Sequence, residues 1–489
     1  MTVTHIDTQE TSAAATAEIL SAAAAAHAGW SATPPAGRAA VLDRVADALE
    51  EAADRLVPVA LEETHLPEAR LRGELKRTAF QLRLFGTVLR EGGYLDARID
   101  HADPEWPMGA PRPDLRRSLR PIGPVAVFSA SNFPFAFSVA GGDTASALAA
   151  GNAVVVKAHE GHPRLSGLTG TVVQDALKAA GVDPHLLSVV FGRDAGTAVL
   201  ADSRIKAAGF TGSIPGGRAL QDIANGRPDP IPFYGELGST NPIFVTRDAA
   251  QARAAEIVAG FLESFTLGTG QFCTKPGIMF VPRGTGMVEE LRNASLPAVG
   301  PMLNGRIEAG FNHVLEALSG IDGVQVLNTA AAGSGAPAPV LLGTGVERLL
   351  ADPQALEAEC FGPAAFVVEY DDESQLVEAA KTFEGQLTAT LQAEPASEVQ
   401  DLVAVLAEKA GRLLWNQWPT GVSVTYAQQH GGPYPATTVP GSTSVGTAAI
   451  TRFLRPVAFQ NFPQHLLPPE LREDNPFAAP RLVDGVRLV

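Results

Sequence analysis

The stretch PVAVFSA, residues 124–130, is followed by DTASALAAG at 143–151 and by NAVVVKA at 152–158. The same alternation continues with RLSGLTGTVVQDALKAAG at 164–181 and LLSVVFG at 186–192. Strands of about five residues that alternate with helices of roughly 10–15 residues predict a parallel sheet covered by helices on both faces. A ligand site is expected at the carboxyl ends of such strands.

Further elements are predicted on both sides of this region. Residues 35–95 place apolar residues at three- and four-residue intervals, which is typical of amphipathic helices. A second β/α region begins near PIFVTRD at 242–248, and a third set of elements runs to about residue 440. Residues 101–118 are rich in proline and charge, which suits an extended excursion. A chain of 489 residues exceeds the usual size of one core, so two or three domains are expected.

Composition argues against several classes of function. The formal net charge is −16, and lysine and arginine form no dense cluster, so nucleic acid is not expected as a partner. No segment offers the roughly 18 unbroken apolar residues of a membrane span. Asp7, Glu10 and Glu18 stand where a secretory signal would carry cationic and apolar residues. The sequence therefore predicts a cytoplasmic protein.

Cys273 and Cys360 are the only cysteines. Two cysteines without a neighbouring cysteine and histidine pattern do not predict a metal site, and a cytosolic enzyme of this size does not need a disulfide. Cys273 lies in TGQFCTKPG, where nearby glycines allow the backbone to approach a ligand closely. A thiol is a nucleophile when it ionises and is otherwise an ordinary core residue. The local sequence leaves both interpretations open.

Four other features suggest chemistry, although each is weak alone. Glu236, in YGELGSTNP, is either a base or a solvated loop carboxylate. Asn132, in SNFPF, is either an oxyanion donor or a turn residue. The glycine-rich turn FTGSIPGG at 210–217 precedes a helix, an arrangement that favours phosphate binding. Lys157 ends NAVVVKA and is either a ligand contact or a solvated lysine.

The order of six motifs resembles the aldehyde dehydrogenase superfamily over nearly the whole chain. They are SNFP, VVVKA, FTGS followed by Gly217, ELG, GQFCT and ECFGP. The resemblance implies that Cys273 is the nucleophile and Glu236 the general base. It also implies that Asn132 and the backbone amide of Cys273 form the oxyanion hole. The expected reaction is the oxidation of an aldehyde to a carboxylic acid through a thiohemiacetal and a thioester.

The resemblance also assigns a binding site for NAD or NADP. Lys157 matches a ribose-binding lysine, and Glu359 and Phe361 match the pair that orients the nicotinamide. Gly212, Ser213 and Gly217 match the pyrophosphate turn. Glu160 matches a residue that accepts hydrogen bonds from the adenosine 2′-hydroxyl, which favours NAD. Three nearby basic residues offer a counterweight that would admit NADP: His162, Arg164 and Arg193.

The implied α/β fold has a Rossmann-like cofactor domain, an α/β catalytic domain and a small β oligomerisation element. We expect the cofactor domain at 1–100 and 122–237, the oligomerisation excursion at 101–121 and the catalytic domain at 238–440. Residues 441–489 form a tail with oligomer or interdomain contacts. A homodimer or homotetramer is expected.

Departures from the common family pattern point to one branch. Ser131 replaces the usual tryptophan, Gly141 replaces a lysine, and ELGST replaces ELGGK. These changes resemble the α-ketoglutaric semialdehyde dehydrogenases and related bacterial NADP-dependent fatty aldehyde dehydrogenases. Lys275 is unusual for that branch, and it either lowers the pKa of Cys273 or faces solvent.

The branch implies 2,5-dioxopentanoate as the substrate and 2-oxoglutarate as the product. The alternatives are a broad aliphatic or fatty aldehyde dehydrogenase, a cysteine esterase, or a non-catalytic protein that keeps the fold. Several side chains are candidates for the substrate tunnel: Phe135, Phe265, Phe272 and Trp418 as apolar walls, and Gln428, Gln429 and His430 as polar contacts.

Overall fold

The stretch that begins at residue 124 folds as a parallel five-stranded sheet in the computed structural model, which describes residues 8–333 and 335–488. Residues 1–7, 334 and 489, which the predicted domains include, lie outside the described residues. The strand order is β5-β4-β3-β6-β7. The strands are β3 (Val125–Phe128), β4 (Val154–Lys157), β5 (Leu187–Val190), β6 (Ala207–Thr211) and β7 (Phe233–Glu236). The predicted parallel sheet is thus confirmed, although β7 follows a proline-rich stretch and was not predicted.

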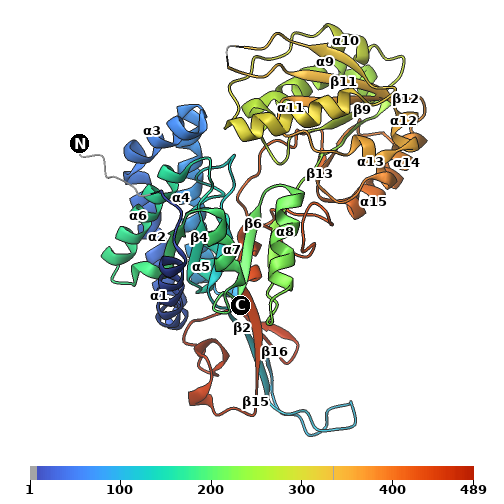
Figure 1. Ribbon diagram of the computed structural model, residues 1–489. Coiled ribbons are helices and arrows are strands. Elements are labelled where there is room, and N and C mark those ends of the chain that lie inside the picture. The colour runs from blue at the N-terminus through green and yellow to red at the C-terminus, as the bar shows by residue number, and fades with distance from the viewer. Residues whose placement is uncertain (1–7, 334, 489) are drawn as a thin grey trace.

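Helices surround this sheet and form the lobe at the left of Figure 1. Those between its strands are α5 (Gly142–Ala150), α6 (Pro163–Ala179), α7 (Arg193–Ala201) and α8 (Ile214–Asn225). The predicted helical region 35–95 contains α2 (Pro35–Glu51), α3 (Ala53–Thr64) and α4 (Glu68–Glu91). Helix α1 (Ala13–Ala32) was not predicted, because alanine on most of its surface leaves no apolar stripe to detect. Trp30 on α1 donates from its indole nitrogen to the carbonyl of Leu148 on α5 at 2.9 Å, which fixes α1 to the lobe.

A seven-stranded sheet forms the second lobe, in the order β10-β11-β12-β9-β8-β13-β14. Its strands are β8 (Ile243–Val245), β9 (Ile278–Pro282), β10 (Gln325–Thr329), β11 (Val340–Gly345), β12 (Ala364–Tyr370), β13 (Gln386–Gln392) and β14 (Ala410–Trp415). All neighbours are parallel except β10 and β11. Two apolar clusters form its core, one around Phe244 and Phe280 and one around Phe261 and Phe265.

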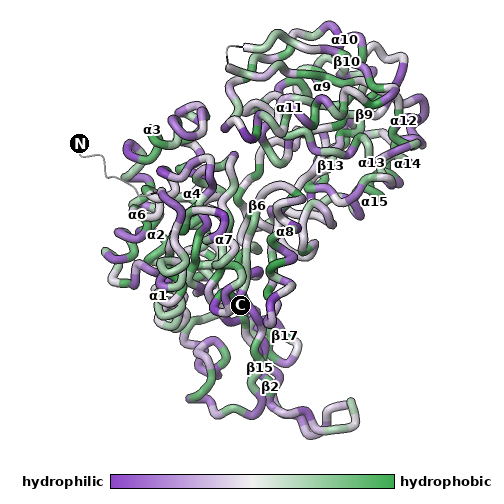
Figure 2. The backbone as a smooth tube through the Cα atoms, in the orientation of Figure 1, coloured by the Kyte–Doolittle hydropathy of each residue, from purple (hydrophilic) through white to green (hydrophobic). Residues whose placement is uncertain are grey.

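Seven helices belong to this second lobe within the described residues: α9 (Arg247–Thr266), α10 (Met287–Asn293), α11 (Gly305–Ser319), α12 (Val346–Ala351), α13 (Pro353–Leu356), α14 (Ser374–Thr382) and α15 (Gln400–Lys409). Figure 2 shows hydrophobic stretches running through both lobes and hydrophilic stretches at their outer turns. Across the described parts of both lobes, no helix combines the length and apolar character that a membrane span requires.

A third sheet projects from the two lobes at the bottom of Figure 1. Its order is β15-β2-β1-β16-β17. The strands are β1 (Ala97–Asp100), β2 (Leu115–Pro121), β15 (Leu454–Gln460), β16 (Arg481–Val483) and β17 (Val486–Leu488). The excursion therefore returns to the molecule as β2, and the tail from 441 onward supplies three of the five strands.

Candidate active site

Cys273 lies in a turn between the short helix η3 (Leu267–Gly270) and β9, where the two lobes meet. The amide of Asn241 donates to the carbonyl of Cys273 at 2.8 Å and holds the turn in place. Gly270 has φ +65°, and a Cβ atom there would lie 2.2 Å from the carbonyl oxygen of Gly362. Glycine at 270 is therefore required to let the Cys273 turn approach the segment that contains Glu359 and Phe361.

Glu236 and His430 lie beside the thiol of Cys273. Glu236 is the last residue of β7 and not, as expected, part of a loop, and it forms an isolated bridge with Thr437. This bridge brings the segment after residue 420 to the site. His430 Nε2 lies 3.5 Å from Cys273 Sγ and 2.8 Å from Glu236 Oε1. The hydroxyl of Ser444 donates to Glu236 Oε2 at 2.5 Å.

Glu236 and His430 have little access to water, whereas Cys273 is partly exposed. Glu236 is 2% exposed and His430 is 1% exposed. Burial and the neighbouring carboxylates of Glu236 and Glu359 raise the pKa of the Cys273 thiol well above its ordinary value. Burial alone would also raise the pKa of Glu236, but the interactions with His430, Ser444 and Cys273 outweigh it and lower that pKa. The resting arrangement is therefore a neutral thiol beside an ionised carboxylate.

Asn132 faces the same turn from the first lobe. Its side-chain nitrogen donates to the backbone carbonyl of Gln271 at 3.0 Å, and the backbone carbonyl of Asn132 accepts a hydrogen bond from the guanidinium of Arg70 at 2.7 Å. An amide group carries two N–H bonds, so one remains that can donate to an oxygen atom bound near Cys273.

A cleft of about 730 Å³ connects Cys273 with the carboxyl ends of β3, β4 and β6. Most of the predicted site residues line it together: Asn132, Lys157, Glu160, Gly212, Ser213, Cys273, Glu359 and Phe361. Glu236 does not line the cleft and lies behind Cys273. Gly217 does not line it either, but a Cβ atom there would lie 2.1 Å from Leu237 Cδ2. Glycine at 217 therefore allows α8 to pack closely against Leu237.

The cleft suits a dinucleotide in its size and in its donors. Ser213 caps α8 by accepting a hydrogen bond from the amide of Gly216, so the amino end of this helix opens into the cleft. The amides and dipole at such an end favour a phosphate.

Charged residues surround Glu160 at the far end of the cleft. Lys157 Nζ and Arg306 Nη1 each lie 3.5 Å from its carboxylate. Among the basic residues expected to offset Glu160, Arg193 lines the cleft. His162 is instead buried against the carbonyl of Ala130, and the expectation for it was wrong.

Arg164 also lies away from Glu160, because it pairs with Glu62 and Glu63 on α3. The further basic residue that lies beside Glu160 is Arg306, and not His162 or Arg164. The contact of Arg306 with Glu160 could not be predicted, because Arg306 lies in the second lobe and far from Glu160 along the chain.

Lys275 neither faces solvent nor approaches the thiol, so both expectations for it were wrong. It is 3% exposed, and its ammonium donates to the carbonyls of Cys360 and Ala364. Both cysteines are free thiols.

Several predicted tunnel residues belong to the core instead. Phe135 and Phe265 are fully buried, and Trp418 packs against the cluster around Phe261. Phe272 does lie near the site, with the guanidinium of Arg70 4.7 Å from its ring centre.

His430 was expected only as a substrate contact, and its contact with both Cys273 and Glu236 was not predicted. The side-chain ligand atoms of these three residues lie within 4.8 Å of one another, a spacing that could also hold a metal ion. The feature of the sequence that could have pointed to His430 is the motif QHGG, residues 429–432.

Comparisons with known proteins find a matching family and two relatives that are similar over most of the chain. Residues 2–306 match the model of the aldehyde dehydrogenase family. The chain is 46% identical over 468 residues to alpha-ketoglutaric semialdehyde dehydrogenase 2 of Azospirillum brasilense, covering 93% of this chain and 88% of that protein. It is 42% identical to the alpha-ketoglutaric semialdehyde dehydrogenase of Acinetobacter baylyi, covering 92% and 87%.

A solved structure of 3,6-anhydro-L-galactose dehydrogenase in complex with NAP has the same fold. It superposes with a TM-score of 0.77 at 21% identity and covers 92% of each chain. These similarities confirm the predicted α/β fold and the predicted resemblance to α-ketoglutaric semialdehyde dehydrogenases.

Proposed function

Because the chain belongs to the aldehyde dehydrogenase family, we propose that it oxidises an aldehyde to a carboxylic acid through a thioester on Cys273, with NAD or NADP as the oxidant. One observation carries this proposal. Cys273 Sγ lies 3.5 Å from His430 Nε2, which lies 2.8 Å from Glu236 Oε1, and Cys273 lines the cleft that suits a dinucleotide.

The first step is activation of the thiol. Since the pKa of Cys273 is raised, the thiol needs a base to become a nucleophile. The carboxylate of Glu236 interacts with the thiol itself and contacts His430 through Oε1, so it can take the thiol proton. His430 bridges the base and the thiol and favours the ionised form of Glu236.

The sulfur then bonds to the aldehyde carbon, and the aldehyde oxygen becomes an oxyanion. The free N–H bond of Asn132 and the backbone amide of Cys273 stabilise that charge, a contribution of roughly 3–4 kcal/mol for a preorganised donor. A nicotinamide held beside Cys273 by the residues that line the cleft would supply the acceptor for the hydride of the same carbon. After Glu236 has released its first proton, it takes one from water, and the resulting hydroxide cleaves the thioester.

We propose that the substrate is 2,5-dioxopentanoate, which is α-ketoglutaric semialdehyde, because the names of both relatives contain this compound. Its carboxylate requires a cationic surface, and three half-buried arginines supply one: Arg70, Arg77 and Arg412. Each has a buried guanidinium nitrogen with no hydrogen-bond partner among the described residues. Arg77 and Arg412 also interact electrostatically with Cys273.

Arg77 and Arg412 contact a short segment next to the nucleophile. Arg412 donates to the carbonyl of Pro419 at 2.7 Å, and Arg77 donates weakly to that of Val422 at 3.4 Å. The amide of Gly421 between them donates to the hydroxyl of Thr274, the residue after Cys273. The positive charges therefore lie close to the point where an aldehyde reacts.

An uncharged aliphatic or fatty aldehyde is the second candidate substrate. The rings of Phe133 and Phe137 lie 5.3 Å apart, and Phe133 lies 5.3 Å from Phe272, so an apolar wall adjoins the same arginines. A cysteine esterase would have no use for the large cleft beside Cys273 or for the residues that line it.

We propose NAD as the preferred cofactor because the carboxylate of Glu160 lies in the cleft beside Lys157. A carboxylate there accepts hydrogen bonds from a ribose and repels a 2′-phosphate. Arg306 and Arg193 reduce that repulsion, so measurable activity with NADP is also expected.

The test is the appearance of reduced cofactor at 340 nm with a panel of aldehydes and each cofactor. We expect kcat/KM for 2,5-dioxopentanoate to exceed that for pentanal, and R77M to lower the first value while leaving the second within about threefold. Equal loss for both aldehydes would reject carboxylate binding by Arg77. No reduced cofactor with any aldehyde would reject the dehydrogenase function itself.

A further inference from the structure

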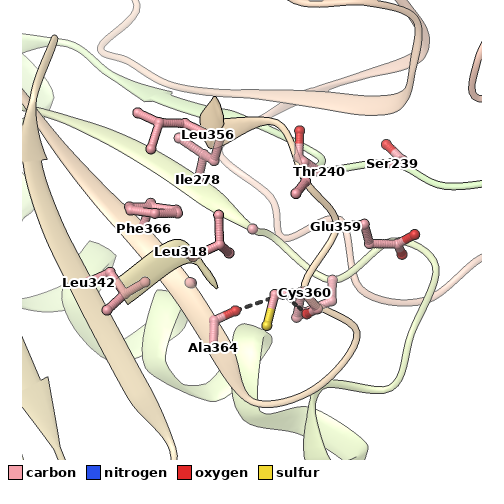
Figure 3. Close-up of a pocket in the computed structure, with 14 residues that line it drawn as sticks. Ser239, Thr240, Ile278, Leu318, Leu342, Leu356, Glu359, Cys360, Ala364 and Phe366 are labelled. Atoms are coloured by element: carbon pink, nitrogen blue, oxygen red, sulfur yellow. Dashed lines mark hydrogen bonds between the residues drawn. The ribbon is translucent and has the colours of Figure 1, made fainter. Parts of the chain in front are cut away.

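Lys275 connects the nucleophile turn to the segment that carries Glu359 and Phe361. Its ammonium donates to the carbonyl of Cys360 at 2.9 Å and to the carbonyl of Ala364 at 2.6 Å. In Figure 3, Ala364 and Cys360 lie together, while the carboxylate of Glu359 extends away from them on the side of Ser239. One side chain thus donates to two backbone carbonyls of this segment, those of residues 360 and 364.

The backbone of Lys275 is fixed to that of Cys273. The amide of Asn241 donates to the carbonyls of both residues, at 2.8 Å for Cys273 and 3.0 Å for Lys275. The backbone amide of Lys275 also donates to the carbonyl of Phe272. The position of the ammonium is therefore set relative to the thiol, and through the ammonium so is the position of Glu359.

A buried ammonium is unfavourable unless it is paired, which indicates a specific need for the charge. The pocket that Lys275 lines has largely apolar walls, and Figure 3 shows Leu318, Leu342, Leu356 and Phe366 on its side away from Glu359. Two of its three N–H bonds donate to carbonyls, and its positive charge acts on Glu359. An apolar side chain would fill the cavity but leave these two carbonyls without a donor.

Glu359 is the ionisable group on which this charge acts. Burial and the Glu236 charge raise the pKa of Glu359, Lys275 and the backbone amide of Ser239 oppose that rise, and the net pKa is about 7. Its carboxylate also lies against Gly238, where a Cβ atom would be 2.7 Å from Oε2. Glu359 lines the dinucleotide cleft, so its charge and direction affect whatever binds there.

We propose that Lys275 is a positioning residue that ties the Cys273 turn to the Glu359–Phe361 segment and thereby orients Glu359 toward the ribose next to the nicotinamide. This inference rests on the proposed dehydrogenase function. It separates two properties of the site, because cofactor binding depends on Lys275 through Glu359, whereas the pKa of the Cys273 thiol is governed mainly by burial and Glu236 and only weakly by Glu359.

The experiment compares full-length wild-type protein with K275M and K275R. Methionine keeps the length of the side chain without its charge, and arginine restores the charge. The dissociation constant for NAD is measured by calorimetry at pH 7 and pH 9, and the rate of Cys273 alkylation by iodoacetamide is measured in parallel. K275Q, which retains an N–H donor, replaces K275M should the latter not fold.

We expect K275M to weaken NAD binding about tenfold at pH 7 while the alkylation rate stays within about twofold. Without Lys275 the pKa of Glu359 rises further, so more of it is protonated at pH 7 and less at pH 9. The loss of affinity should therefore be smaller at pH 9, and K275R should recover most of it. K409M is the matched control, because Lys409 also donates to a backbone carbonyl, that of Phe383, far from the cleft.

The inference is overturned if K275M binds NAD as the wild type does at both pH values, or if K409M loses as much affinity. An equal change in alkylation rate would also overturn it, because Lys275 would then act on the thiol. Failure of the wild-type protein to bind NAD or NADP would instead reject the proposed function on which the inference rests.

Discussion

His430 determines how protons move in the candidate site, because it contacts both the nucleophile and the base. It lies 3.5 Å from Cys273 Sγ and 2.8 Å from Glu236 Oε1, and its interaction lowers the pKa of Glu236. A lowered carboxylate pKa keeps Glu236 ionised, and therefore competent as a base, further into the acidic range.

Replacing His430 with glutamine should therefore move the acid limb of the kcat/KM profile to higher pH. Without His430 the pKa of Glu236 rises, so Glu236 becomes protonated at a pH where it is ionised in the wild type. We also expect kcat to fall on the order of 10²-fold, the lower range for a lost acid–base group. Full pH–rate profiles provide the measurement, and H313Q, at an exposed position on α11, is the control. An acid limb that does not move in H430Q would contradict this role.

Glu160 should set the choice between NAD and NADP. In E160Q the repulsion of a 2′-phosphate disappears while Arg306 and Arg193 remain, so the NADP/NAD ratio of kcat/KM should rise. A change of about tenfold corresponds to about 1.4 kcal/mol, which is close to the ~1 kcal/mol between two unit charges about 4 Å apart in water. E256Q removes a comparable exposed pair with Arg253 on α9 and should leave the ratio unchanged. A constant ratio in E160Q would remove Glu160 from the cofactor assignment.

At the scale of elements, the position of α8 should control cofactor affinity. A Cβ atom at Gly217 would lie 2.1 Å from Leu237 Cδ2 and 3.1 Å from the ring of Phe210, so G217A must move either α8 or these two side chains, which line the same cleft. We expect the dissociation constant for NAD to rise at least fivefold and kcat at saturating NAD to change little.

G310A on α11 is the control for G217A, since a Cβ atom there meets no atom within 4 Å. Alanine at that position should raise the unfolding temperature slightly, because it favours helix over glycine by up to about 1 kcal/mol. Unchanged NAD affinity in G217A would show that α8 does not form the pyrophosphate site.

The elements visible from sequence are those whose own residues reveal them. The valine-rich strands β3 and β4 and the amphipathic helix α4 follow directly from periodicity. Helix α1 was missed because alanine gives no apolar stripe, and β7 was missed because its four residues follow prolines.

The same limit applies to the candidate site. Cys273 and Asn132 stand in recognisable motifs, whereas the contact of His430 with Glu236 depends on a bridge between distant segments. Lys275 was misplaced because its partners, the carbonyls of Cys360 and Ala364, belong to the backbone and leave no mark in the sequence.

At the scale of the whole molecule, we propose that the projecting sheet joins copies of this chain. Its edge strand β17 exposes Val486 by 61%, and Leu488 is also exposed. An open apolar edge strand is a ready template for pairing with another chain. We therefore expect V486E to weaken the assembly, so that its sedimentation coefficient is smaller than that of the wild type.

V326E is the matched control for V486E. Val326 is 53% exposed on β10, the edge strand of the other large sheet. The V326E substitution should leave the assembly unchanged. A loss of assembly with V326E, or none with V486E, would place the interface elsewhere.

The central claim is that the aldehyde carbon becomes bonded to Cys273 and leaves only when Glu236 activates water. The most direct measurement is the mass of E236Q after rapid mixing with 2,5-dioxopentanoate and NAD, with peptide mapping and absorbance at 340 nm. E236Q lacks the carboxylate charge that raises the pKa of the Cys273 thiol, so water or buffer can accept the thiol proton in its place. Because hydrolysis of the thioester is slow in this variant, we predict an acyl group on Cys273, NADH in amounts no greater than that acyl group, and no acylation without NAD. Repeated turnover to NADH with an unmodified Cys273, or an acyl group on Cys360 instead, would contradict the account.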